Sequence, residues 1–135
     1  MSVCVLDTDV VIAALDRTDA HHHAAVRAFG RWAGEGVELL LCTVNYAEAL
    51  VRPAEEEQTM RTAVDAIASL GIRLHAPDAT LARSAARRRA LGISLADGFA
   101  LATAERAGAH LATFDKRVRR ALGPAGLSLS PALSH

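Results

Sequence analysis

Short apolar runs alternate along the chain with stretches in which apolar residues recur at helical spacing. The runs predict buried strands over residues 3–6, 37–42, 72–75 and 110–114, with a last edge strand over 127–129. The stretches between them predict helices over residues 8–15, 21–33, 43–51, 55–70, 78–91, 93–107 and 116–122. Strands that alternate with helices form right-handed βαβ units. We therefore expect an α/β fold with a central parallel sheet of four or five strands.

The composition favours helices packed closely on that sheet. The 135 residues suffice for a single domain, residues 1–135, and 51% of them are hydrophobic although only 4% are aromatic. No apolar run approaches the roughly 18 residues that span a bilayer, and no signal-peptide pattern opens the chain, so a cytoplasmic location is expected. Cys4 and Cys42 fall in predicted strands, where free buried thiols are expected.

Four acidic residues stand where the predicted topology brings them to one edge of the sheet. Asp7 and Asp115 each follow a strand directly, whereas Glu48 and Asp97 each fall in the first turn of a predicted helix. Ligands of open parallel sheets bind outside the carboxyl ends of the strands. These four acids are therefore candidates for one functional site.

Each of these acids also has an ordinary structural interpretation. Asp7 and Asp115 fit helix N-caps, and the two other acids fit the capping boxes Asn45-x-x-Glu48 and Ser94-x-x-Asp97. Gathered in one place, however, four carboxylates repel one another unless a cation neutralises them. An all-oxygen set without Cys or His suits Mg²⁺ or Mn²⁺, and one or two such ions can supply a water nucleophile for phosphodiester hydrolysis.

Opposite charges are concentrated in the two halves of the chain. Residues 1–70 carry 11 acidic and 5 basic side chains, whereas residues 71–135 carry 4 acidic and 10 basic ones. One basic cluster follows Asp115 directly, which favours it for contacts with phosphate groups, and it consists of Lys116, Arg117, Arg119 and Arg120. The other basic cluster can equally be a solvated helix face or a contact with a protein partner. It consists of Arg83, Arg87, Arg88 and Arg89.

The His21-His22-His23 run is expected to be a solvated helix start. Adjacent residues of a helix point in different directions, so the three rings of a regular helix cannot converge on one metal ion.

Four segments in this order resemble the PIN-domain ribonucleases, and among them the VapC type of toxin from bacterial toxin–antitoxin pairs. The segments are LDTDV at 6–10, YAEAL at 46–50, ISLADGFALATA at 93–104 and AHLATFDK at 109–116. The resemblance covers nearly the whole chain. It implies a three-layer α/β/α PIN fold, a Mg²⁺ or Mn²⁺ site, and endonucleolytic cleavage of RNA, mostly transfer or ribosomal RNA. It also implies a cognate antitoxin and a homodimer.

The same resemblance implies roles for individual residues. Asp7, Glu48 and Asp97 would be the core metal-binding acids, with Asp115 as a fourth that often binds the metal through water. Thr8 and Thr113 would be the polar neighbours that orient these acids.

The sequence departs from the family pattern at two positions. Asparagine is commoner than Asp9, so Asp9 either adds charge near the site or faces away as a cap. Alanine is commoner than Gly98, so we expect glycine to loosen this helix start slightly.

Two other functions compete with a nuclease. Asp7-Thr8-Asp9-x-Val11 also fits haloacid-dehalogenase-like phosphatases, in which Asp7 would be the nucleophile and Asp9 the acid/base. That interpretation needs a well-placed lysine, for which Lys116 is the only candidate, and it gives Glu48 and Asp97 no role. The other alternative is a non-catalytic interaction module that merely holds a metal.

Overall fold

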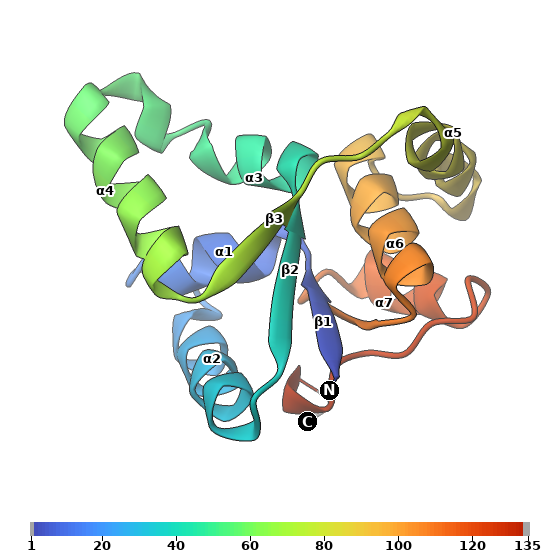
Figure 1. The fold of residues 1–135 in the computed structure, drawn as a ribbon, viewed down its shortest axis with the longest axis horizontal. Helices are drawn as coiled ribbons and strands as arrows, with labels where there is room; N and C mark the ends of the chain where they lie inside the picture. The colour runs from blue at the N-terminus through green and yellow to red at the C-terminus, as the bar shows by residue number, and fades with distance from the viewer. Residues whose placement is uncertain (1, 134–135) are drawn as a thin grey trace.

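The computed structural model describes residues 2–133, and a four-stranded parallel sheet forms their centre (Figure 1). The strands are β1 (Val3–Leu6), β2 (Glu38–Cys42), β3 (Ile72–His75) and β4 (His110–Ala112). They stand in the order β3-β2-β1-β4, and every neighbouring pair is parallel. The first strand therefore lies inside the sheet, with the carboxyl end of β4 beside its own. The predicted α/β class and parallel sheet are confirmed.

Helices cover both faces of this sheet. They are α1 (Thr8–Leu15), α2 (His22–Glu35), α3 (Thr43–Leu50), α4 (Glu57–Ser69), α5 (Ala79–Arg88), α6 (Leu95–Ala107) and α7 (Lys116–Leu122), with 3₁₀ turns η1 (Pro53–Glu55), η2 (Arg89–Leu91) and η3 (Pro131–Leu133). Figure 1 shows α1, α2 and α4 on one side of the sheet and α6 and α7 on the other, with α5 outside α6. Within residues 2–133, no helix has the length and apolar character needed to cross a bilayer.

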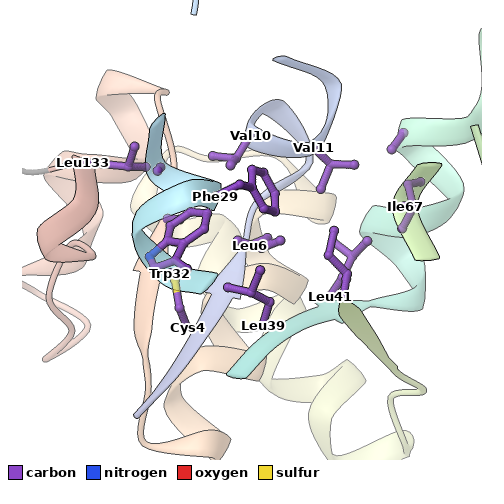
Figure 2. Packing of buried hydrophobic residues seen from close by; sticks show 14 of the residues in the cluster. Cys4, Leu6, Val10, Val11, Phe29, Trp32, Leu39, Leu41, Ile67 and Leu133 are labelled. Atoms are coloured by element: carbon purple, nitrogen blue, oxygen red, sulfur yellow. The ribbon is translucent and has the colours of Figure 1, made fainter. Parts of the chain in front are cut away.

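The alternation of strand residues places an apolar core on each face of the sheet, apart from a small third cluster between α5 and α6. Leu6 and Leu41 pack with α1, α2 and α4 in the first core, where Trp32 is almost wholly buried (Figure 2). Val5 and Leu40, their neighbours along the strands, pack with α6 and α7 in the second core. Successive side chains of a strand point to opposite faces, so a single apolar run fills both cores. This arrangement is the expected three-layer α/β/α architecture.

The predicted elements are reproduced with a few shifted boundaries. The predicted strand over residues 110–114 is wrong at its end, because β4 stops at Ala112 and the next two residues turn away to bond acidic side chains. The predicted edge strand over 127–129 is reduced to one isolated bridge between Leu111 and Leu129. The sheet of the described residues therefore has four strands. Cys4 and Cys42 are free and buried, as expected.

Gly98 lies where α6 packs closely against α5. A Cβ atom at this position would stand 2.5 Å from the carbonyl oxygen of Ala85. The missing side chain allows α5 and α6 to approach each other, which gives this glycine a packing role. Whether it also loosens the helix start stays a prediction.

Candidate functional site

Asp7 occupies a fixed position between the end of β1 and the start of α1. One of its carboxylate oxygens accepts a hydrogen bond from the Thr8 amide at 2.9 Å, and the other accepts one from the Thr113 hydroxyl at 2.8 Å. Its own backbone amide donates to the Ala112 carbonyl at 2.9 Å. The side chain is 1% exposed. Asp7 is thus both the N-cap of α1 and a carboxylate held rigidly at the strand end.

Asp9 turns toward the same place from the first turn of α1. Its Oδ2 accepts a hydrogen bond from the Phe114 amide at 2.9 Å, and the Thr113 hydroxyl lies 3.5 Å from the same oxygen. Its Oδ1 is buried without a hydrogen-bond partner among the described residues. Asp9 was expected either to add charge near the site or to face away as a cap, and in the structure it lies near the site.

Thr113 connects the acids at the ends of β1 and β4. Its hydroxyl donates to Asp7 and accepts a hydrogen bond from the Asp115 amide at 3.2 Å. Asp115 in turn caps α7, because its Oδ1 accepts from the Arg117 and Val118 amides at 2.8 and 3.4 Å. Thr113 therefore lies directly beside these acids, while its role in orienting metal ligands stays a prediction.

Asp97 reaches the site from the other core. It completes a capping box with Ser94, in which the Asp97 amide donates to the serine hydroxyl at 3.1 Å and the Ser94 amide donates to the carboxylate at 3.2 Å. Its negative charge raises the pKa of both Asp7 and Asp9. The capping and site interpretations of Asp97 are therefore compatible. We call Asp7, Asp9, Asp97 and Asp115 the acid cluster.

Two members of the acid cluster, Asp7 and Asp9, resist ionisation. Burial, followed by the charges of Asp9 and Asp97, raises the pKa of Asp7 well above its usual range. Burial also raises the pKa of Asp9 to about 6, with smaller contributions from the charges of Asp115 and Asp97 and an opposing one from the Phe114 amide. Such crowding of carboxylates is unfavourable at neutral pH without a counter-charge.

Glu48 differs from the other expected site residues. The helix α3 starts at Thr43 with Cys42 as its N-cap, so Asn45 is not a cap and Glu48 lies in the second turn. The predicted capping box at this helix is therefore wrong, because the helix starts at Thr43, as its apolar pattern predicts, two residues before Asn45. Glu48 is exposed and lines a separate groove with Ile12 and Arg52. No described contact joins it to the acid cluster, so its role as a metal ligand stays a prediction.

Asn45 is a buried residue of the site that sequence reasoning treated only as a cap. Its amide nitrogen donates to the Thr8 hydroxyl at 3.1 Å and to the Ala96 carbonyl at 3.0 Å, while its Oδ1 has no partner among the described residues. It thereby ties α1, α3 and α6 together around the acids. The sequence feature that could have predicted this burial is the position of Asn45 one helical turn before the apolar residues 49 and 50.

The donor set fits a hard divalent cation. Every side chain of the acid cluster offers carboxylate oxygens, and Asp9 has a buried oxygen that nothing in the described structure satisfies. No three His, Cys, Asp or Glu side chains of residues 2–133 are already placed to hold a metal ion. The reason is local, because Asp97 and Asp115 are turned to their helix caps. A bound cation would have to draw these carboxylates from the caps.

Comparison with known proteins identifies the family. The sequence matches the PIN domain family over residues 4–123, whereas no curated protein matches it significantly. Among solved structures it is similar to VapBC2 from Rickettsia felis bound to a promoter DNA fragment, with a TM-score of 0.74, 15% identity, and 95% of this chain and 97% of that chain covered.

Two further solved structures have the same fold. Mycobacterium tuberculosis VapC20, described as a toxin that cleaves the sarcin-ricin loop, gives a TM-score of 0.73 at 18% identity over 94% of this chain and 98% of that one. FitAcB from Neisseria gonorrhoeae gives a TM-score of 0.68 at 20% identity, with 98% of this chain and 99% of that chain covered. Because the family match spans the carboxyl edge of the sheet and all four residues of the acid cluster, this chain belongs to the PIN-domain family.

Proposed function

We propose that this protein is a metal-dependent endoribonuclease that acts as the toxin of a toxin–antitoxin pair. The observation that carries the proposal is the acid cluster, in which four carboxylates from two separate cores gather at one edge of the sheet. The raised pKa values of Asp7 and Asp9 and the unpartnered Asp9 Oδ1 are features of a site that needs a divalent cation. The PIN-domain family supports the same chemistry.

The residues of the chain have distinct parts in this proposal. Asp7, Asp9, Asp97 and Asp115 would hold Mg²⁺ or Mn²⁺, and Glu48 would join them by the family resemblance. Bound there, the cation would lower the pKa of a water molecule and neutralise charge on the phosphate. Thr113 keeps Asp7 oriented through its 2.8 Å hydrogen bond. Burial of Asp7 limits the access of bulk water to this carboxylate.

The cations beside the acid cluster would contact the RNA backbone. Lys116, Arg117 and Arg120 are exposed on α7, directly after Asp115. Arg119 is half-buried, and its Nε donates to the Thr113 carbonyl at 3.1 Å. An acidic site by itself repels a polyanion, so phosphate contacts from α7 would compensate for that repulsion.

The biological partners follow from the family resemblance and from the solved relatives. VapC20 is described as a toxin that cleaves the sarcin-ricin loop, a description that supports RNA as the substrate class. VapBC2 is an assembly bound to promoter DNA, and it supports a protein partner for this chain as well. We expect a cognate antitoxin that blocks the site, a homodimer, a transfer or ribosomal RNA substrate, and action in the cytoplasm as a single PIN domain.

Cleavage by the purified protein tests the proposal directly. Mixed transfer and ribosomal RNA is incubated with the protein in Mg²⁺, in Mn²⁺ or in EDTA, and the products are separated on a denaturing gel. We expect cleavage only with a metal, and a loss of at least about 100-fold in the Asp7→Asn and Asp97→Asn variants. Asp65→Asn, an exposed acid on α4, is the matched control and should cleave normally.

Two results would contradict this function. Wild-type cleavage rates in Asp7→Asn or Asp97→Asn would exclude the acid cluster as the catalytic centre. A covalent aspartyl-phosphate on Asp7, detected by mass spectrometry after incubation with a phosphate ester, would instead support the phosphatase alternative.

A further inference from the structure

An open cavity of about 380 Å³ lies between α2, the segment after β4, and the start of α7. We call it the basic cavity, and its polar and aromatic lining consists of His21, Arg27, Arg31, Phe114, Lys116 and Arg119. Neither the family resemblance nor the proposed chemistry gives a role to its α2 side. Its volume falls at the lower end of the range of small-molecule sites, which is about 300–1,000 Å³.

The basic cavity adjoins the acid cluster through two consecutive residues. The Phe114 amide donates to Asp9 at 2.9 Å, while the Phe114 ring lines the cavity. The Thr113 hydroxyl donates to Asp7, while its carbonyl accepts from Arg119, another lining residue. A polymer whose reacting group lies at the acid cluster would therefore place its next unit in the basic cavity.

The lining is strongly cationic. It includes four cationic side chains and no acidic one. Arg31 is partly neutralised, since it pairs with Glu35 at 3.2 Å and donates to the Pro131 carbonyl. Arg27 and Lys116, in contrast, form no ion pair with any residue in 2–133. These two free charges, together with Arg119, favour an anionic ligand.

A stacked ring pair stands in the same cavity. The His21 and Phe114 rings are parallel to within 5°, with centroids 4.4 Å apart. His21 is exposed and caps the stack on its solvent side, whereas Phe114 is half-buried. Nucleic acid bases stack on aromatic surfaces of this kind regardless of sequence, and cations beside the rings bind the adjoining phosphate.

We infer that the basic cavity is a nucleotide subsite for the residue of the RNA strand next to the cleaved bond. The base extends the His21–Phe114 stack, and Arg27, Lys116 and Arg119 bind its phosphate. This inference rests on the proposed function, because RNA is the ligand. An acidic peptide would use the same cations, but it would gain nothing from the stacked rings. The combination of both features therefore favours a nucleotide.

Binding without cleavage tests the subsite. The probe is a fluorescein-labelled single-stranded oligoribonucleotide of ten nucleotides, and its anisotropy is followed in EDTA at several salt concentrations. Arg27→Ala should weaken binding about 5- to 10-fold and reduce the salt slope by about 0.7, the value for one lost phosphate contact on a single strand. His21→Ala should weaken binding by a similar factor without changing the slope, and His21→Phe should restore it.

Two exposed residues outside the basic cavity provide matched controls. Arg87 lies on α5 and forms no ion pair with a described residue, and His23 has its ring against His22 rather than Phe114. Arg87→Ala and His23→Ala should both bind the probe like the wild type. Because all four substituted positions are exposed, the variants should melt at the wild-type temperature.

The outcomes separate this inference from the proposed function. Unchanged affinity and slope in both Arg27→Ala and His21→Ala would overturn the subsite, even if cleavage by the wild type depends on Asp7. Variants that keep RNA affinity but lose affinity for a glutamate-rich peptide would also overturn it, in favour of a protein contact. Weakened RNA binding in both variants would support a nucleotide site in the basic cavity, whereas a wild type that cleaves no RNA would contradict the proposed function.

Discussion

The Phe114 amide donates a 2.9 Å hydrogen bond to the Asp9 carboxylate, across 105 positions of the chain. This bond holds the segment after β4 against the first turn of α1. It uses only Oδ2 of the carboxylate, and the buried Oδ1 has no partner among the described residues. The hydrogen bond thus fixes the position of the Asp9 side chain, whereas the buried negative charge of this side chain destabilises the folded protein.

Asp9→Asn should therefore stabilise the metal-free protein. The amide oxygen can still accept the Phe114 hydrogen bond, while the ionised carboxylate is removed from the acid cluster. A folded pKa of about 6 against the ordinary aspartate value of 3.8 corresponds to a destabilisation of roughly 3 kcal/mol at neutral pH, at 1.4 kcal/mol per pKa unit. We expect a rise in Tm of several degrees in EDTA at pH 7.5, measured by calorimetry. An unchanged or lower Tm would contradict the placement of Asp9 as a destabilising charge.

Acidification should stabilise the metal-free protein for the same reason. Asp7 and Asp9 have raised pKa values, so the folded state binds protons more tightly than the unfolded state does. Their destabilising effect is absent below the unfolded pKa near 4 and grows as the pH rises through the folded value, about 6 for Asp9. The Tm in EDTA at constant ionic strength should therefore rise as the pH is lowered from 7.5 to 5.

Metal binding should reverse this dependence. Mg²⁺ or Mn²⁺ competes with protons for the carboxylates, so it should raise the Tm more at pH 7.5 than at pH 5. Asp7→Asn should lose most of the metal-induced shift, and Asp65→Asn should keep it. Equal metal shifts in wild type and Asp7→Asn would show that the ion binds elsewhere. Asp16 and Asp78 have lowered pKa values and titrate below this pH range, so they do not obscure the effect.

Thr113→Val should lower activity far more than it lowers stability. Valine has nearly the same shape but neither donates to Asp7 nor accepts from the Asp115 amide. We expect a loss of about 10- to 100-fold in cleavage or in Mg²⁺ affinity, typical of residues that orient metal ligands. The cost in unfolding free energy should be about 1–3 kcal/mol. Thr113→Ser keeps the hydroxyl and should recover most of the activity, whereas equal defects in both variants would indicate a packing role.

Gly98→Ala should destabilise the protein although alanine favours helices. The added Cβ would meet the Ala85 carbonyl oxygen at 2.5 Å, so α5 and α6 must separate. The expected loss is about 1–3 kcal/mol, measured by urea unfolding. Gly30→Ala on α2 is the matched control, because no atom lies within 4 Å of its added Cβ. It should gain roughly 0.5–1 kcal/mol, and equal effects at the two positions would refute the close contact.

The elements of the fold could be predicted because they depend on local pattern. The residue ranges 8–15, 72–75 and 116–122 were predicted with the bounds that the structure has. The gathering of Asp7, Asp97 and Asp115 was also predictable, because it follows from strand order and from the ends of parallel strands. The inward position of Asp9 was not, since it depends on how Phe114 turns after β4, a contact between distant segments.

Glu48 and Asn45 illustrate the same limit within one helix. The spacing Asn-x-x-Glu fits a capping box, yet Cys42 already has extended backbone angles and α3 starts at the next residue. Asn45 is therefore the third residue of the helix and not its cap. Asn45 is thereby buried against Thr8 and Ala96, while Glu48 faces the groove beside Arg52.

Asn45 has a mechanical consequence for the whole molecule. Its two hydrogen bonds join α1, from the first core, to the start of α6, from the second core. Asp7 and Asp97 are anchored to these same two helices. Sliding one layer over the sheet would therefore change the gap between these two carboxylates. The two hydrogen bonds of the Asn45 amide oppose such sliding, so the rigidity of the layered fold fixes the distance between the Asp7 and Asp97 carboxylates.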